Sequence, residues 1–165
     1  MARYLVAAGV ALVALCVPAV VEADTQPVSG TTLSVLGIAS SGPVALTNFA
    51  PGQTAAGTGT VTVTSTGPTW VLRAQDASVT NPGRLLRTTG STGATALTQP
   101  LGWSATPTLG GTGGSGALSG TAAVAASGTL SNLVNVSYSQ TIGTTEQLAT
   151  GSVYGLTVTW TVSAT

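Results

Sequence analysis

Alternation of apolar and polar residues with a period of two is the feature that most limits what this chain can fold into. The alternation is clearest over residues 153–162, where Tyr154, Trp160 and the aliphatic residues between them fall on one face and glycine and threonine fall on the other. Residues 60–64 and 133–140 alternate in the same way. Such runs are typical of β-strands with one buried and one solvated face. Shorter strands are expected at residues 33–38, 70–74 and 120–125.

Glycine and proline separate these runs, as in Ser41-Gly42-Pro43, Ala50-Pro51-Gly52 and Asn81-Pro82-Gly83. Strands at this spacing with turn residues between them predict an all-β fold, a single antiparallel β-sandwich of Ig-like or Greek-key type with about seven to nine strands. The glycine-rich residues 110–116 read as a long surface loop inside that one domain.

The N-terminus has the pattern of a secretory signal peptide. One positive charge at Arg3 precedes an apolar run over residues 5–21, and Val21-Glu22-Ala23 supplies small or tolerated residues at the positions that a signal peptidase recognises. Cleavage after Ala23 leaves a mature domain of residues 24–165; cleavage after Ala19, or retention of the run as a membrane anchor, remains open. The mature domain then contains no cysteine, so we expect an exported protein without disulfides.

The charge composition disfavours several classes of partner. Beyond residue 23 the only charged residues are Asp24, Arg73, Asp76, Arg84, Arg87 and Glu146. Three arginines on a neutral chain do not provide the clustered cations that nucleic-acid binding needs. We therefore expect no nucleic-acid partner, and no membrane partner once the signal is cleaved.

The same scarcity argues against catalysis and metal binding. The chain has no histidine and no lysine, so a serine nucleophile lacks its usual base. A two-carboxylate glycosidase would need two of Asp24, Asp76 and Glu146, and nothing in their spacing selects a pair. Zinc would lack its preferred ligands. The prediction is a protein that is not an enzyme and has no cofactor.

Two short motifs place tryptophan on predicted strands. The first is Trp70-Val71-Leu72, a Trp-x-Leu tripeptide after a glycine turn, and the second starts at Tyr154 and continues as Val158-Thr159-Trp160-Thr161-Val162. Together they resemble the WxL domain of Gram-positive surface proteins, whose distal motif ends in Thr-Trp-Thr-Leu. Val162 stands here in place of the final leucine.

This resemblance implies a secreted protein held non-covalently at the cell wall, with peptidoglycan or another wall glycan as ligand and other exported surface proteins as possible partners. The motif residues Trp70, Leu72, Tyr154, Thr159 and Trp160 are therefore the candidate ligand-binding residues. An indole ring can stack on a sugar. The tryptophans can equally fill a core, and the alternation around Trp160 favours core packing.

The functional hypothesis is thus a non-catalytic surface protein that binds peptidoglycan. The alternatives are a structural subunit of a pilus or surface fibre, in which an edge strand near Thr60 accepts a strand from a neighbour, or an adhesin for another glycan. Four charged residues lie close together in the sequence, Arg73, Asp76, Arg84 and Arg87. We expect them to form a solvated surface group. The alternative is that they contact anionic wall polymers.

Overall fold

The computed structural model describes residues 34–67, 69–90 and 95–165, which all belong to one compact unit, Thr32–Thr165. In this part of the chain there are ten β-strands and no helix, so the all-β prediction is confirmed. No helix among these residues is long and apolar enough to cross a membrane. The predicted signal peptide, residues 1–23, lies outside the described residues.

The longest connections between strands are residues 41–53, 90–101 and 142–152. Their bounds are β1 (Leu36–Ser40), β2 (Thr54–Ser65), β3 (Trp70–Asp76), β4 (Leu86–Thr89), β5 (Gly102–Pro107), β6 (Thr112–Ala117), β7 (Ala123–Gly128), β8 (Asn132–Thr141), β9 (Val153–Gly155) and β10 (Val158–Ala164).

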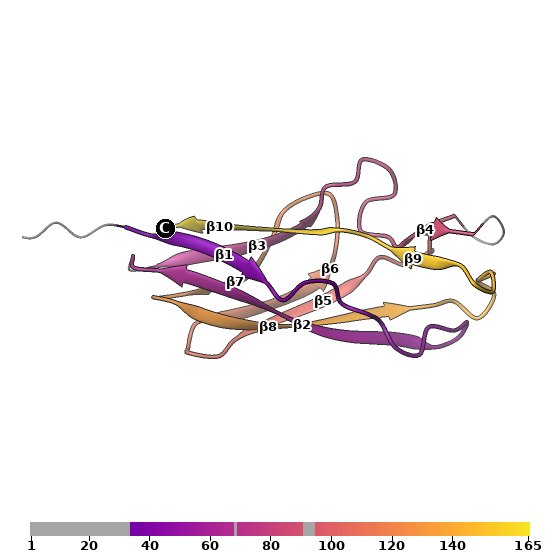
Figure 1. Ribbon diagram of the computed structural model, residues 1–165, viewed down its shortest axis with the longest axis horizontal. Helices are drawn as coiled ribbons and strands as arrows, with labels where there is room; N and C mark the ends of the chain where they lie inside the picture. Colours follow the sequence, from indigo (N-terminus) through magenta and orange to yellow (C-terminus); the bar gives the residue numbers. More distant parts are fainter. Residues whose placement is uncertain (1–33, 68, 91–94) are drawn as a thin grey trace, which may run out of the picture. The chain divides into compact units, whose positions relative to one another are not determined.

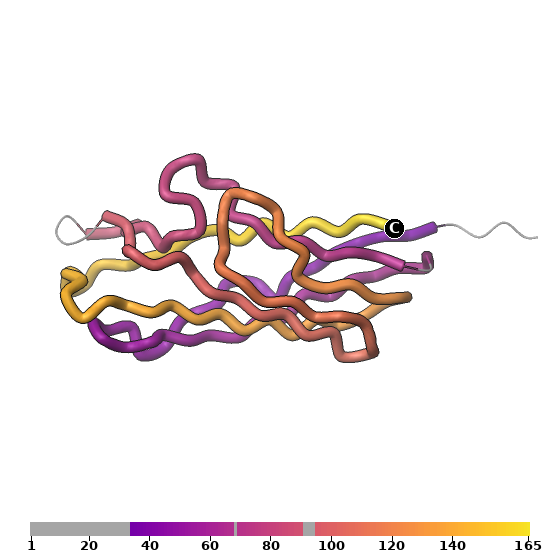
Figure 2. Tube along the Cα trace, turned by 180° about the vertical axis from the view of Figure 1, so that it is seen from behind, coloured from indigo at the N-terminus to yellow at the C-terminus, as the bar shows by residue number. Residues whose placement is uncertain are grey.

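Eight strands form one antiparallel sheet in the order β1-β2-β8-β5-β6-β7-β3-β10. The sheet curls until its two edge strands, β1 and β10, lie side by side, as both views show (Figure 1, Figure 2). No ladder joins these two edges, so the sheet is nearly closed rather than closed. We call the gap between β1 and β10 the seam. Strands β4 and β9 pair separately as a small second sheet.

The inner face of the curled sheet forms the core because buried and exposed residues alternate along its strands. On β3 every second residue from Trp70 to Asp76 is buried, and β8 alternates likewise from Asn132 to Val136. The main core joins these side chains to Val61, Val63 and Trp103. A smaller cluster of Ala55, Leu85, Leu97 and Ile142 lies beside β4 and β9.

Four local expectations were wrong. The glycine-rich residues 110–116 are not a surface loop, because Thr112–Ala117 form β6, which pairs with β5 and β7. The strand expected at residues 120–125 runs instead over Ala123–Gly128. The alternating run over residues 153–162 is interrupted after Gly155, so its two halves belong to different sheets. Strands β4 and β5 were not predicted.

The exposed edge is not at Thr60. Its carbonyl accepts a hydrogen bond from Ser41 N at 2.9 Å, and its own N–H donates to Ser41 Oγ at 3.0 Å. Strand β2 is an interior strand between β1 and β8, so the free edges belong to β1 and β10.

Candidate functional site

A cavity of about 700 Å³ lies where β1 and β10 diverge. One wall is the segment that continues β1, residues 40–46, and the opposite wall is residues 152–158 with Trp160. The rest of the lining consists of Phe49, Gly59, Thr60, Val61, Leu85, Leu101 and Tyr138. This volume is within the range of roughly 300–1,000 Å³ that is usual for small-molecule sites. We call it the seam cavity.

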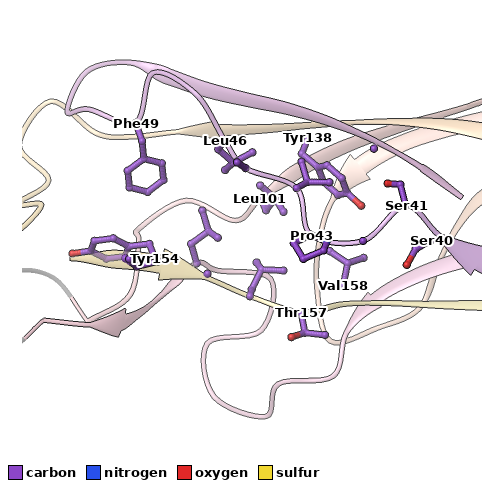
Figure 3. A pocket seen from close by; sticks show the side chains of 18 of the residues that line it. Ser40, Ser41, Pro43, Leu46, Phe49, Leu101, Tyr138, Tyr154, Thr157 and Val158 are labelled. Carbon is purple, nitrogen blue, oxygen red and sulfur yellow. The ribbon is translucent and has the colours of Figure 1, made fainter. Parts of the chain in front are cut away.

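Aromatic side chains gather in the seam cavity. Its lining includes Phe49, Tyr138, Tyr154 and Trp160, whereas Trp70 and Trp103, the other aromatic residues that the structure describes, are buried in the core. The rings of Phe49 and Tyr154 approach from opposite walls, with centroids 5.7 Å apart and planes tilted by 31° (Figure 3). An aromatic pair therefore lines one end of the cavity.

Tyr138 contributes a phenol hydroxyl to the cavity. It is half-buried on β8, and burial raises the pKa of its phenol while a hydrogen bond with Trp160 acts in the opposite direction. An indole N–H can only donate, so in this contact the Tyr138 hydroxyl oxygen is the acceptor. Figure 3 shows this hydroxyl directed toward Ser41 and away from the Phe49 end.

Two glycines allow residues 41–46 to form a wall of the cavity. A Cβ at Gly57 would lie 2.7 Å from Ala45 O, and a Cβ at Gly59 would lie 2.8 Å from Val44 Cγ2. Both glycines occupy positions of β2 that share a face with buried Val61. Without side chains there, the segment after β1 can lie across the inner face of β2.

The cavity is lined without charge. None of its residues is Asp, Glu, Lys or Arg, and its polar groups are hydroxyls and backbone amides. The residues that the structure describes contain no group of three or more His, Cys, Asp or Glu side chains able to hold a metal ion. The arrangement therefore suits an uncharged ligand with both apolar faces and hydrogen-bonding groups.

Both described carboxylates hold loops in place, away from the cavity. Asp76 is buried and accepts hydrogen bonds from Ser78 N at 2.9 Å and Gly83 N at 2.8 Å. Glu146 accepts from Thr98 N at 2.6 Å, Thr98 Oγ1 at 2.7 Å and Gly143 N at 3.1 Å.

The pKa of Glu146 reflects these contacts. Desolvation by burial raises it, but the hydrogen bonds from Thr98 and Gly143 and the nearby Arg84 charge together hold the pKa below its ordinary value. Arg84 itself donates to the carbonyls of Leu97 and Thr98. Arg73 donates to Ser163 Oγ at 3.0 Å.

The two tryptophan motifs lie on neighbouring strands. Strands β3 and β10 are paired antiparallel, with Leu72 opposite Val162 and Ala74 opposite Trp160. Trp70 and Leu72 are fully buried, and Trp70 Nε1 donates to Leu130 O at 2.7 Å.

The other motif residues are divided between the core and the cavity. Trp160 packs against the main core and also lines the seam cavity, and Tyr154 lines the cavity from β9. Thr159 is half-buried and does not line it. The candidate set thus includes two cavity residues, Tyr154 and Trp160.

Several residues that line the seam cavity were not predicted from the sequence. Phe49, Tyr138 and residues 41–46 belong to no motif, and residues 41–43 had been assigned only to a turn. The available signal was Gly57-Thr58-Gly59, because glycine inside a strand marks close approach of another backbone.

Comparison with known proteins yields no match among protein-family models, curated proteins or solved structures.

Proposed function

We propose that this chain is a non-catalytic, exported cell-surface protein that binds an uncharged part of a cell-wall glycan, such as peptidoglycan, in the seam cavity. The observation that carries the proposal is a cavity of about 700 Å³ lined by four aromatic side chains and no charged one. A sugar ring presents apolar C–H faces and hydroxyl groups. Aromatic faces and protein hydroxyls complement both kinds of surface.

The resemblance to WxL domains supports the same proposal. The proximal motif at Trp70 and Leu72 and the distal motif at Thr159 and Trp160 are far apart in the sequence, but the fold places them on the paired strands β3 and β10. We propose that the chain is a distant relative of that family and acts at the Gram-positive cell wall. Export would depend on the N-terminal signal pattern.

We also propose that the architecture is a two-layer sandwich in which β6 crosses between the layers. Residues 114–117 of β6 pair with β5, whereas Thr112 and Gly113 pair with β7. Strands β1, β2, β8 and β5 would then form one layer, and β7, β3 and β10 the other. The seam cavity would lie at the open side between the layers.

The test is co-sedimentation of residues 24–165 with purified Gram-positive cell walls. This segment contains the compact unit Thr32–Thr165 with its own core, so it is expected to fold without the preceding residues. Two variants form a matched pair, Thr157→Glu and Thr161→Glu. Both threonines are exposed, but only Thr157 lines the cavity.

Wild type and Thr161→Glu are expected to pellet with the walls, and Thr157→Glu to remain in the supernatant, because a carboxylate in the uncharged cavity disfavours a neutral ligand. If folded wild type does not pellet, wall binding is wrong. If Thr157→Glu pellets as well as Thr161→Glu, binding occurs elsewhere on the surface.

A further inference from the structure

Two hydroxyl groups in the seam cavity have a proton that no described residue accepts. Ser41 Oγ accepts a hydrogen bond from Thr60 N at 3.0 Å, and the Tyr138 hydroxyl accepts one from the Trp160 indole. A hydroxyl that accepts a hydrogen bond still has its own proton to donate. Within residues 34–67, 69–90 and 95–165, neither hydroxyl donates to another group. Both are therefore available as donors to a ligand.

The two donors face the same part of the cavity. Both residues line it, and Figure 3 shows the Tyr138 hydroxyl directed toward Ser41. A Cβ at Gly59 would lie 3.2 Å from Ser41 Oγ and 4.0 Å from Tyr138 Cε2, so the two side chains border one space. A carbonyl oxygen has two lone pairs and can accept from two donors at once. This pair of hydroxyls therefore suits a carbonyl group of the ligand.

The backbone beside these hydroxyls is also without partners. Hydrogen bonds to carbonyls of β2 hold Ser41 N at 2.9 Å and Thr47 N at 2.8 Å. The five residues between them, 42–46, span only three residues of β2, 57–59, so they form an arch. All five line the cavity, and in the described part of the chain the backbone of this arch makes no hydrogen bond. The arch therefore offers carbonyl groups to an N–H of the ligand.

The rest of the lining requires apolar ligand atoms. Besides the aromatic rings, both walls and the floor of the cavity are aliphatic, with Val44, Leu46, Leu101, Leu156 and Val158. A sugar hydroxyl buried against such side chains loses its hydrogen bonds to water, whereas a methyl group gains from burial there. An ammonium or carboxylate group is disfavoured, because no lining residue is charged.

We propose that the seam cavity recognises the acetamido group of an N-acetylated amino sugar, an inference that rests on the proposed glycan binding. The group is neutral and combines a carbonyl, an N–H and a methyl. Its carbonyl oxygen accepts from the hydroxyls of Ser41 and Tyr138, its N–H donates to a carbonyl of the arch, and its methyl packs against the aliphatic lining. The hydroxyl that a plain sugar has at this position supplies neither the carbonyl nor the methyl.

The first test compares two trisaccharides by isothermal titration calorimetry with residues 24–165. Triacetylchitotriose and cellotriose have the same ring stereochemistry and linkage, and they differ only in having an acetamido group or a hydroxyl on one carbon of each ring. The dissociation constant of cellotriose is expected to be at least about tenfold higher than that of triacetylchitotriose. Equal binding, a preference for cellotriose, or no binding of either trisaccharide would overturn the proposal.

The second test removes each donor in turn, with Ser41→Ala and Tyr138→Phe. Each variant should weaken binding of triacetylchitotriose by about three- to tenfold and leave binding of cellotriose nearly unchanged, because cellotriose has no carbonyl at that position. The matched control is Ser137→Ala, since Ser137 is exposed on β8 and does not line the cavity. Circular dichroism checks that the variants fold. Unchanged binding of triacetylchitotriose by both folded donor variants contradicts the assignment.

Failure of this inference is distinguishable from failure of the proposed function. If wild type pellets with cell walls but does not prefer triacetylchitotriose, wall binding stands and the acetamido inference is wrong. If wild type prefers triacetylchitotriose but does not pellet with walls, the inference stands and the wall is not the target. Chitin carries the same group, so co-sedimentation with chitin particles and with bacterial walls separates these two sources.

Discussion

Substitution of Trp70 separates its structural role from a ligand-binding role. The side chain is fully buried in the main core, and its indole N–H donates to Leu130 O at 2.7 Å. Leu130 has a left-handed backbone with φ of 55°, which a bulky residue adopts only when the surrounding structure holds it. Trp70 therefore fills the core and fixes the turn before β8.

Two substitutions of Trp70 should lower the free energy of unfolding by different amounts. Trp70→Ala removes nearly the whole buried side chain and should destabilise the fold by about 3–5 kcal/mol. Trp70→Phe keeps most of the apolar volume and loses the donor, so about 1–2 kcal/mol is expected from the missing hydrogen bond and incomplete packing. Domains of this kind are typically stable by about 5–15 kcal/mol, so the Phe variant should fold and the Ala variant should be marginal.

Urea unfolding of residues 24–165, followed by intrinsic fluorescence and circular dichroism, measures these differences. The Phe variant should unfold at lower urea with an unchanged m-value, and its folded form should pellet with cell walls as wild type does. A Phe variant of wild-type stability that no longer pellets would refute the reasoning, because it would make the Trp70 indole a ligand contact instead of a core residue.

Three further substitutions test other parts of the structure. Gly59→Val should push residues 41–46 off β2 and weaken wall binding, since its Cβ would meet Val44 Cγ2 at 2.8 Å; binding isotherms against the walls measure the loss. Asn132→Ala removes the acceptor of Leu109 N at 3.1 Å and the donor to Gly110 O at 3.0 Å, and should cost about 2–3 kcal/mol, with faster hydrogen exchange in that turn. The pKa of Glu146 is lower in the folded protein than its ordinary value of 4.5. The extra free energy of unfolding of wild type relative to Glu146→Gln should therefore be fully present above pH 4.5 and be lost as the pH falls through the folded pKa. Urea titrations at several pH values measure this difference.

The strands that the sequence predicts correctly are those in which apolar and polar residues alternate along the chain. Strand β8 was predicted at residues 133–140 and observed as Asn132–Thr141. In its middle, Val134, Val136 and Tyr138 point inward and alternate with outward polar residues. Strand β6 was missed because half of its residues are glycine and nearly all of them are exposed. It is held by its neighbours, through pairing with β5 and β7, and not by its own pattern.

The candidate site was less predictable than the fold because its residues come from segments without a shared motif. Trp160 and Tyr154 were recognised from the distal motif, but Tyr138 is one inward position among several on β8. Only the curl of the sheet brings it to Trp160. The position of the gap between β1 and β10 decides which aromatic residues line the cavity and which fill the core. No local sequence pattern predicts the position of that gap.

The seam cavity and the free edge of β1 have a common structural origin. After Ser40 the chain leaves the edge of the sheet and passes over Gly57 and Gly59, so β1 ends after five residues and cannot extend a ladder along the rest of the seam. The departing segment forms a wall of the cavity, while the short strand behind it keeps unpaired backbone groups. Larger residues at 57 and 59 would close off that path and favour a longer β1. The two glycines thus determine the backbone route that forms one wall of the seam cavity.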